Sequence, residues 1–425
     1  MRIERSTPLL AVFAVLAALA VWAQNAIIPF SKPFWGLFDY QFDLDVYRAG
    51  AQTVLDGGDL YRAKLLGQMD FTYAPISMVF FVPFAWMSAT VAHVVWTLGI
   101  FVALYFVIVL CFRTLGHDVT WRLRGIALSL VVIATLLEPI RTTIWFGQIN
   151  VFLMLLILWD LLRGSDSRLR GAGVGLAAGI KLTPLLFAVY LVLVRQWKAA
   201  ATLVGAFAGT IAVGFALLPG ASWDYWTETL LDSDRVASPQ TTGNQSIRGA
   251  IANLGGTDEP STLLWLLLAG IVALLGLGAA VLAHRHGRDL LALTLVGMTS
   301  CAVSPVAWGH HWVWLLPLLV IGIHLLTTLS SPVRRGLAAL AVVGGFAYSV
   351  AWRHHLPYPI WYVNRSVDEA YLTGLFMKGE GRWYQFFTVQ PYNVILVVVA
   401  TAVIVVYGTG IRRSRPTADA VTRRR

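Results

Sequence analysis

Long apolar runs alternate with short polar stretches along most of this 425-residue chain. About 20 predominantly apolar residues in a helix are enough to cross the hydrocarbon core of a bilayer. Ten runs reach or approach that length, at residues 8–28, 89–112, 125–140, 149–162, 199–218, 261–283, 289–306, 312–329, 335–352 and 393–411. The pattern predicts an all-α polytopic membrane protein, built as one bundle of transmembrane helices.

Two more segments are apolar but interrupted. Lys181 and Pro184 break residues 171–194 at the middle, and basic residues flank both ends of this segment. A turn at the break would return the chain to the side it came from, as two half-length helices or as two thin spans, which gives about ten to twelve spans. Residues 73–87 are too short to span and hold two prolines, so we expect a half-helix that dips in from the outer face.

The charged residues sharpen this picture. They make up 13% of the chain, about half their share in an ordinary soluble domain. The net charge is +10, but the arginines and lysines lie in short clusters between apolar runs, which is typical of topology signals and argues against a nucleic-acid partner. With alternating spans, these clusters and both termini fall on one side, which the positive-inside rule identifies as the cytoplasm. Most acidic residues then lie in the outer loops.

We expect residues 1–411 to form a single transmembrane domain and residues 412–425 to form a basic, disordered cytoplasmic tail that is attracted to anionic lipids. Cys111 and Cys301 lie within apolar segments, so neither a disulfide framework nor a metal site is indicated. The chain has no phosphate-binding loop and no dinucleotide fingerprint, and we expect no cofactor.

Two aspartates in the first outer loop are the first candidates for chemistry. Asp43 and Asp45 stand among apolar neighbours at the start of a predicted helix over residues 46–56. Either could be the N-cap of that helix, because an aspartate satisfies free backbone N–H groups there. Either could instead be an exposed carboxylate that acts as a base. Position alone leaves both interpretations open.

A second polar group joins two short spans, and it consists of Glu138, Arg141, Gln148 and Asn150. Glu138 and Arg141 are three residues apart and can pair on one helix face. The two amides could bind sugar hydroxyls from a helix start, or they could merely cap a turn. Lys181 is a further candidate, because it lies deep in the membrane region, where a charge costs at least ~2.5–3.5 kcal/mol and is a functional candidate by default.

Adjacent histidines, His310 and His311, precede another apolar run among three tryptophans. A metal site is disfavoured, because neighbouring residues of a helix point about 100° apart and no carboxylate partner lies nearby in the sequence. Phosphate binding at a helix N-terminus suits them better. The last group, Asn244 and Arg248 in "NQSIRGAI", is either a hydrogen-bonding cluster with one cation or a solvated loop.

Six motifs occur in order along the chain: "DLDVYRAGAQTVLDGGDLY", "FTYAP", "EPIRTTIWFGQINVFL", "GIKLTP", "NQSIRGAI" and "SPVAWGHHWVWLLPL". Together they closely resemble the actinobacterial polyprenyl-phosphate-mannose-dependent α-(1→2)-mannosyltransferases. These are GT-C type membrane glycosyltransferases that build phosphatidylinositol mannosides and lipomannan. The resemblance implies a GT-C bundle in the plasma membrane with its active site on the outer face. One departure is Ala74, where the family usually has a second proline.

The resemblance also implies roles for the candidates. Asp43 takes the place of the family's catalytic base, whereas Asp45 falls on a variable position of that motif. His310 and His311, with His311 favoured, match residues near the donor phosphate. Motif membership alone adds, as substrate-binding candidates, Lys181, Gln148, Asn150, Asn244 and Arg248, beside Glu138 and Arg141.

The implied donor is a β-mannosyl phosphate on a polyprenol, and the implied acceptor is a glycolipid, phosphatidylinositol mannoside or lipomannan. An α-linked product means inversion in one displacement, which needs one base for the acceptor hydroxyl. The leaving phosphate is a stable anion, so no general acid is required, in contrast to glycosidases. The alternatives are an arabinofuranosyltransferase of the same family and, less favoured, a lipid or sugar transporter, which would show paired broken helices in two repeats.

Overall fold

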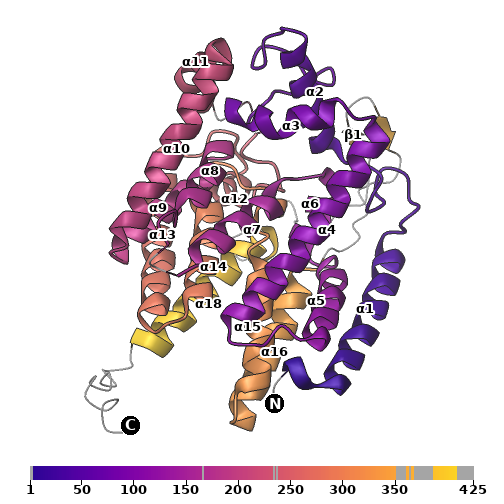
Figure 1. Ribbon diagram of the computed structural model, residues 1–425, viewed down its shortest axis with the longest axis vertical. Coiled ribbons are helices and arrows are strands. Elements are labelled where there is room, and N and C mark those ends of the chain that lie inside the picture. The colour runs from indigo at the N-terminus through magenta and orange to yellow at the C-terminus, as the bar shows by residue number, and fades with distance from the viewer. Residues whose placement is uncertain are drawn as a thin grey trace.

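The computed structural model describes residues 3–164, 167–232, 235, 238–350, 360–362, 365–367 and 386–408. The predicted tail 412–425 lies outside these residues, and so do most of the residues between the predicted spans 335–352 and 393–411. The described chain is a bundle of helices (Figure 1), with one pair of three-residue antiparallel strands, β1 (Ile360–Tyr362) and β2 (Arg365–Val367). The predicted all-α polytopic membrane fold is confirmed.

In the part of the chain that the structure describes, five helices are long and apolar enough to cross a membrane: α1 (Thr7–Ile27), α4 (Ala89–Thr114), α10 (Trp197–Leu217), α13 (Thr262–Arg285) and α18 (Pro391–Gly408). Their outward faces expose large apolar side chains such as Leu263 and Leu274, as a lipid-facing surface requires. The other five predicted runs are helices of 12–17 residues: α5 (Trp121–Ala134), α7 (Asn150–Leu161), α14 (Asp289–Val303), α15 (Leu315–Thr328) and α16 (Pro332–Tyr348).

A sharp break explains one of the shorter helices. The apolar stretch before and after Gly147 forms α6 (Glu138–Phe146) and α7, which meet at 118° and together count as a sixth span or a re-entrant loop. Where about ten to twelve spans were predicted, the described residues hold five by length and composition, or six with this bent pair. The difference arises because polar turns divide the apolar sequence into pieces shorter than a bilayer.

Residues 171–194 turn back at their middle, as predicted. They form α8 (Ala172–Ile180), a short 3₁₀ turn η3 (Thr183–Leu185) and α9 (Leu186–Leu193). A side chain at Gly175 would lie 2.4 Å from the carbonyl oxygen of Leu203, and one at Gly179 would lie 2.2 Å from Thr210 Oγ1, so α8 runs alongside α10 from its first turns to its middle. Helix α9 then ends just before α10 begins. The chain therefore returns to the end of the bundle from which α8 started.

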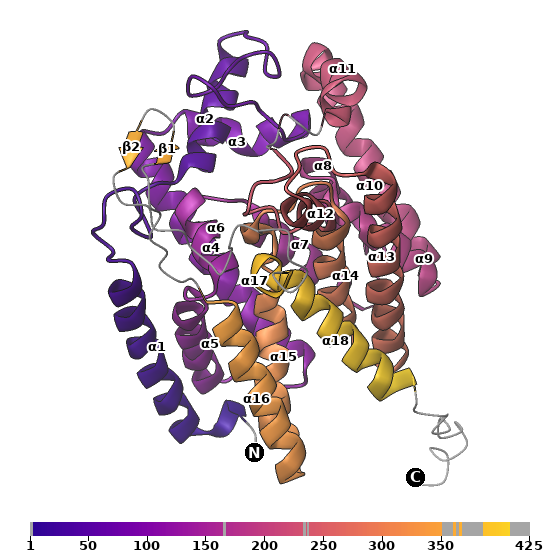
Figure 2. The same cartoon turned by 180° about the vertical axis from the view of Figure 1, so that it is seen from behind.

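The two ends of the bundle differ in what they carry. The start of α1 and the end of α18 lie at one end, and the helices α2 (Phe42–Leu55), α3 (Met78–Ala85) and α11 (Pro219–Thr227) lie at the other (Figures 1 and 2). At the first end Arg122 Nε donates to Thr7 Oγ1 at 2.9 Å, and the His286 ring packs 4.6 Å from that of Tyr407. The basic loops after α4 and after α13 are therefore gathered at the end opposite α2.

The α2 end is built from short elements. The predicted half-helix is the 3₁₀ turn η2 (Pro75–Ser77) followed by α3, which packs on α2. The 3₁₀ turn η1 (Ile3–Arg5) lies at the opposite end, against α5, and the remaining short elements are η4 (Thr229–Leu231), α12 (Ile247–Gly255), η6 (Gly309–His311) and α17 (Phe386–Val389). Many of their ends meet between α2 and the core of the bundle, where they leave a cavity.

Candidate active site

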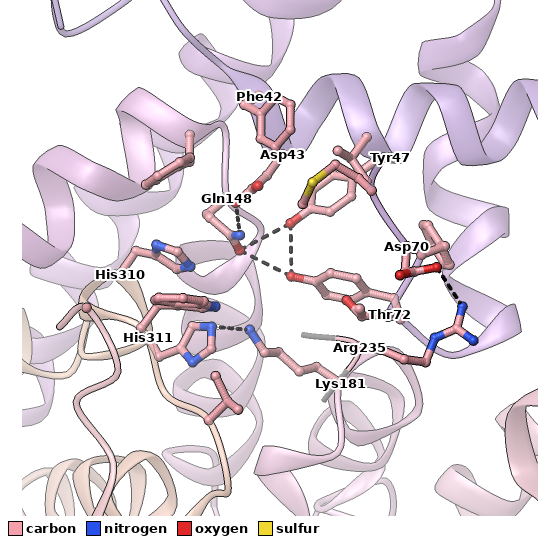
Figure 3. A pocket seen from close by; sticks show the side chains of 18 of the residues that line it. Phe42, Asp43, Tyr47, Asp70, Thr72, Gln148, Lys181, Arg235, His310 and His311 are labelled. Carbon is pink, nitrogen blue, oxygen red and sulfur yellow. Dashed lines mark hydrogen bonds and ion pairs between the residues drawn. The ribbon is translucent and has the colours of Figure 1, made fainter. Parts of the chain in front are cut away.

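A cavity of about 730 Å³ opens at the α2 end of the bundle. Its wall brings together four segments that are far apart in the sequence: the start of α2, the α6–α7 break, the α8–η3 turn and η6 (Figure 3). Six of the predicted site residues line it: Asp43, Glu138, Gln148, Lys181, His310 and His311.

The α6–α7 break is fixed directly against α2. Gly147 has the left-handed φ of 70°, and a side chain there would come within 2.8 Å of Leu44 Cβ, so glycine is required twice over. The backbone N–H of Gln41 donates to the carbonyl oxygen of Trp145 at 2.7 Å. These contacts place Gln148, the residue after the glycine, beside Asp43.

Asp43 has the surroundings of a base. Its carboxylate oxygen Oδ2 accepts a hydrogen bond from Gln148 Nε2. Burial raises the pKa of Asp43 to about 6, while the Gln148 bond and the charge of Lys181 act in the opposite direction. A carboxylate with a pKa near 6 is mostly ionised at neutral pH and still basic enough to accept a proton from a hydroxyl.

Two tyrosines that were not selected from the sequence complete this side of the cavity. The hydroxyls of Tyr47 and Tyr73 both donate to Gln148 Oε1, at 3.1 and 3.2 Å, and lie 2.9 Å from each other. A signal for Tyr47 was present, because it follows Asp43 by four residues and so shares its helix face. Tyr73 lies in the "FTYAP" motif, but nothing in the sequence places that motif beside α2.

Lys181 provides the positive charge of the site. Its Nζ donates to Asn150 Oδ1 at 3.0 Å, contacts His311 Nε2 at 2.8 Å and lies 5.5 Å from the centre of the Tyr73 ring. An ammonium has three N–H donors, so one is left for a ligand. Asn150 itself lies behind the cavity wall, where its Nδ2 donates to Gln148 Oε1 and to the His310 carbonyl.

The two histidines face the cavity as neutral rings. Burial lowers the pKa of both His310 and His311 well below its usual value, and the charge of Lys181 lowers it further. Since His311 Nε2 accepts from Lys181, its proton belongs on Nδ1. His311 Nδ1 and His310 Nε2 are buried and have no hydrogen-bond partner among the described residues. The cation of this group is therefore Lys181, with the histidines as neutral neighbours.

The structure separates the two aspartates of the first motif. Asp45 does not line the cavity and instead pairs with Arg48 Nη1 at 3.2 Å and His93 Nε2 at 2.9 Å. The N-cap of α2 is Gln41, with no side-chain capping bond, so the interpretation of either aspartate as the N-cap is wrong. The helix begins earlier than predicted, at Phe42, which puts both carboxylates in its first turn.

Besides Asn150, three predicted residues lie outside the cavity lining. Arg141 is buried and donates from Nη2 to the Trp35 carbonyl at 2.7 Å. Asn244 forms an isolated β-bridge with Trp308, and its Oδ1 accepts from the Ala307 N–H at 3.1 Å. Arg248 lies with its guanidinium 5.8 Å from the ring of Trp265. Glu138 does reach the cavity, and its carboxylate accepts from the hydroxyl of Tyr392.

A charged pair from two loops also lines the cavity. Arg235 Nη2 donates to Asp70 Oδ1 at 3.1 Å, which ties the loop after η4 to the loop before η2. Neither residue stands out in the sequence, because both lie in loops without a recognisable motif. Among the described residues, no three histidine, cysteine or carboxylate side chains form a group that could hold a metal ion.

Comparisons with known proteins bear on the family of the chain. Residues 71–305 match the model of glycosyltransferase family 87. The chain is 38% identical to the polyprenol-phosphate-mannose-dependent α-(1-2)-phosphatidylinositol mannoside mannosyltransferase of Mycobacterium tuberculosis over 68% of this chain and 72% of the relative. It is 34% identical to the corresponding phosphatidylinositol pentamannoside mannosyltransferase of Mycolicibacterium smegmatis over 76% of this chain and 77% of the relative.

A third relative is more distant. The α-(1->3)-arabinofuranosyltransferase of Corynebacterium glutamicum is 32% identical over 43% of this chain and 42% of the relative. No solved structure matches the chain significantly. The family match covers more than half of the chain, and the two mannosyltransferases align with more than two thirds of it. The chain is therefore a multi-pass membrane glycosyltransferase that belongs to glycosyltransferase family 87.

Proposed function

We propose that this enzyme transfers mannose from a polyprenyl phosphate to a phosphatidylinositol mannoside, forms an α-(1→2) linkage and inverts the anomeric carbon. The observation that carries the proposal is that Asp43 and Lys181 line one cavity, so a base and a cation are available to one bound sugar phosphate. The names of the mannosyltransferase relatives supply the donor and the acceptor class.

The reaction needs only these two charges. Asp43 Oδ takes the proton of the acceptor hydroxyl as its oxygen attacks the anomeric carbon. The bond from that carbon to the phosphate oxygen breaks, and its electrons leave with the polyprenyl phosphate. Lys181 stabilises the charge that develops on the phosphate through its remaining N–H.

The distribution of charge over the bundle supports a proposal for the side of the membrane. The basic loops, the start of α1 and the end of α18 share one end, and the cavity lies at the other. The positive-inside rule assigns the first end to the cytoplasm, so both termini are cytoplasmic and the active site is extracytoplasmic. Nucleotide sugars are cytoplasmic, and a lipid-linked donor is the form of mannose that reaches such a site.

The test is a transfer assay with purified enzyme in lipid nanodiscs. Polyprenyl phosphate carrying radiolabelled mannose is offered with phosphatidylinositol mannosides of different length, and product linkage is determined by α-(1→2)-mannosidase digestion. We expect mannose transfer that Asp43→Asn abolishes. A parallel arm offers polyprenyl phosphate arabinose, because of the partial match to an arabinofuranosyltransferase. Transfer of arabinose but not of mannose would overturn the proposal.

A further inference from the structure

A continuous path of hydrogen bonds joins the cation of the site to its base. Lys181 Nζ donates to Asn150 Oδ1 at 3.0 Å, and Asn150 Nδ2 donates to Gln148 Oε1 at 3.2 Å. Gln148 Nε2 then donates to Asp43 Oδ2. Figure 3 shows the two ends of this path on different sides of the cavity, with Gln148 beside Asp43 and Lys181 beside His311. The two amides in between are buried.

The direction of every bond in this path is fixed by chemistry. A lysine ammonium can only donate, so Asn150 must turn its oxygen toward Lys181 and its nitrogen away. That nitrogen also donates to the His310 carbonyl at 3.0 Å, which can only accept. Gln148 must therefore present its oxygen to Asn150, and its nitrogen is left for the carboxylate of Asp43.

Two tyrosines hold the central amide in this orientation. Tyr47 and Tyr73 donate to Gln148 Oε1 at 3.1 and 3.2 Å, and the Tyr47 ring stacks on Phe81 with centroids 4.3 Å apart. A flip of the Gln148 amide would set its oxygen against the Asp43 carboxylate and its nitrogen against the N–H of Asn150. The amide therefore has one favourable orientation.

We propose that Asn150 and Gln148 are positioning residues that couple the base to the donor phosphate, so that donor binding strengthens Asp43 as a base. This inference rests on the proposed function. In the free enzyme, the ammonium of Lys181 polarises the two amides, and aligned hydrogen bonds strengthen one another. Gln148 then stabilises the Asp43 carboxylate and weakens it as a base. A phosphate that draws Lys181 toward itself relaxes this polarisation and leaves Asp43 more basic.

The consequence is an order of events. Asp43 becomes an effective base only once the donor phosphate is in place beside Lys181, which limits proton removal from an acceptor, or from water, before a sugar is available. No conformational change of a helix is needed, because the signal passes through two amides already in contact.

The ionisation states of the groups that face Asp43 determine which groups of the cavity can titrate in the working pH range. Burial raises the pKa of Tyr47 and Tyr73 well above its usual value, so these hydroxyls stay neutral in the working range. The α6–α7 break contributes the amide of Gln148, and the α8–η3 turn contributes Lys181. Across the cavity, the buried His310 and His311 are neutral. An ionisation near pH 6 is therefore expected for Asp43, and Glu138, a second buried carboxyl that lines the cavity, is distinguished from it by labelling resolved to the residue.

The test compares two pH profiles. The acid limb of kcat/KM for the donor reports the free enzyme, and the acid limb of kcat reports the substrate complex. In the wild type we expect the kcat limb at higher pH than the kcat/KM limb. Asn150→Leu breaks the path, so Gln148 should stabilise the Asp43 carboxylate less in the free enzyme. The acid limb of kcat/KM should therefore move up by about half to one pH unit, the effect of one weakened hydrogen bond. The gap in pH between the kcat/KM limb and the kcat limb then narrows. An unchanged gap in a folded variant would overturn the coupling.

Two additions keep the result decisive. If Asn150→Leu does not fold, Gln148→Met replaces it, because methionine keeps the length of the side chain. The gap between the kcat/KM limb and the kcat limb should narrow in this variant too. Asn253→Leu is the matched control: Asn253 is a buried amide in α12 that donates to the Thr241 and Gly249 carbonyls and lies outside the path. It should lower the melting temperature and leave the gap between the limbs as in the wild type.

A readout without turnover separates this inference from the proposed function. Carbodiimides label protonated carboxyls, so the pH dependence of Asp43 labelling, followed by mass spectrometry, reports its ionisation directly. Addition of polyprenyl phosphate should move the labelling curve to higher pH in the wild type and less so in Asn150→Leu. If the curve moves in this way while no mannose is transferred, the proposed function fails and the coupling stands. If mannose is transferred and polyprenyl phosphate moves the labelling curves of the wild type and of Asn150→Leu equally, the coupling is wrong and the proposed function stands.

Discussion

Two clusters in this molecule each contain buried Asn and Gln side chains, and they differ in the groups that these amides bind. The cavity network, formed by Asp43, Gln148, Asn150, Lys181 and His311, ends on a carboxylate and an ammonium. The loop anchor, formed by Asn244, Gln245, Gln390 and Asn393, makes its bonds mainly to backbone groups: Gln245 Nε2 to the Val389 carbonyl at 2.8 Å, for example, and Asn393 Nδ2 to the Gln245 carbonyl at 3.0 Å.

The difference shows how to tell a site from a scaffold. Both clusters lie in breaks between helices, where polar residues of a membrane protein are functional candidates. In the loop anchor, the amides satisfy backbone groups that no regular helix satisfies, which is a structural task. In the cavity network, charged groups open onto free volume. The anchor still serves the site indirectly, because the Gln245 N–H and Asn244 Oδ1 hold Ala307, close before the two histidines.

The largest effect should come from the carboxylate of the cavity network. Asp43→Asn keeps the shape of the side chain and removes its ability to take a proton, so kcat should fall by about 10²–10⁴-fold, the usual contribution of a general base. The transfer assay in nanodiscs measures this, with thermal unfolding to establish that the variant is folded. Activity within about threefold of the wild type would be incompatible with Asp43 as the base.

The second-largest loss of activity should come from Lys181, the cation at the other end of the network. Lys181→Met keeps the length of the side chain and removes the charge that would meet the leaving phosphate. We expect kcat/KM for the donor to fall by about 10²–10³-fold, as when one donor to a developing anion is removed. Varying the donor and acceptor concentrations separately should show the loss on the donor side. A loss confined to the acceptor KM would place the donor phosphate elsewhere.

A change of pH should alter activity less than these two substitutions, but its effect should be specific to the cavity network. Asp43 must be ionised to act, and its pKa is raised to about 6 by burial. The value of kcat/KM for the donor should therefore be level above this pH and fall about tenfold per pH unit well below it. The profile of Asp45→Asn should overlay the wild type, since only the ionisation of Asp43 is required. A limb near the ordinary aspartate pKa would mean that Asp43 is hydrated in the working enzyme.

The loop anchor should respond in stability before it responds in activity. Asn244→Leu leaves the N–H groups of Ala307 and Ser246 without their acceptor, and each lost partner costs about 1–3 kcal/mol of unfolding free energy when buried. We expect a clearly lower melting temperature and a kcat within about tenfold of the wild type for the folded fraction. Asn253→Leu serves as a second buried-amide substitution. A loss of activity as deep as that of Asp43→Asn at unchanged stability would make Asn244 part of the site.

The centre of the cavity network was more predictable from the sequence than its edges. The apolar runs indicated the helices, and the turn at Lys181 was predicted because a charge and a nearby proline do not suit the middle of a straight span. Gln148 and the histidines were found through motifs. Tyr73, Asp70 and Arg235 were missed because their place depends on how loops fold over α2, which no periodicity encodes. Asn244, Arg141 and Arg248 were selected as polar residues in breaks, and the sequence does not say whether such a side chain faces a cavity or a backbone carbonyl.

The smallest effect should come from the aspartate next to the base. Asp45 lies on another face of α2, where it pairs with His93 of α4 and with Arg48, whose guanidinium also donates to the carbonyls of Phe84 and Met87 in and just beyond α3. Asp45→Asn keeps some of these hydrogen bonds, so we expect a loss of about 1 kcal/mol or less in unfolding free energy and a change of kcat below about threefold. Because the two aspartates share one helix and one turn, this pair of variants isolates the role of the cavity from that of the helix. Equal losses of kcat in both would mean that α2 itself, rather than the carboxylate of Asp43, is what the reaction requires.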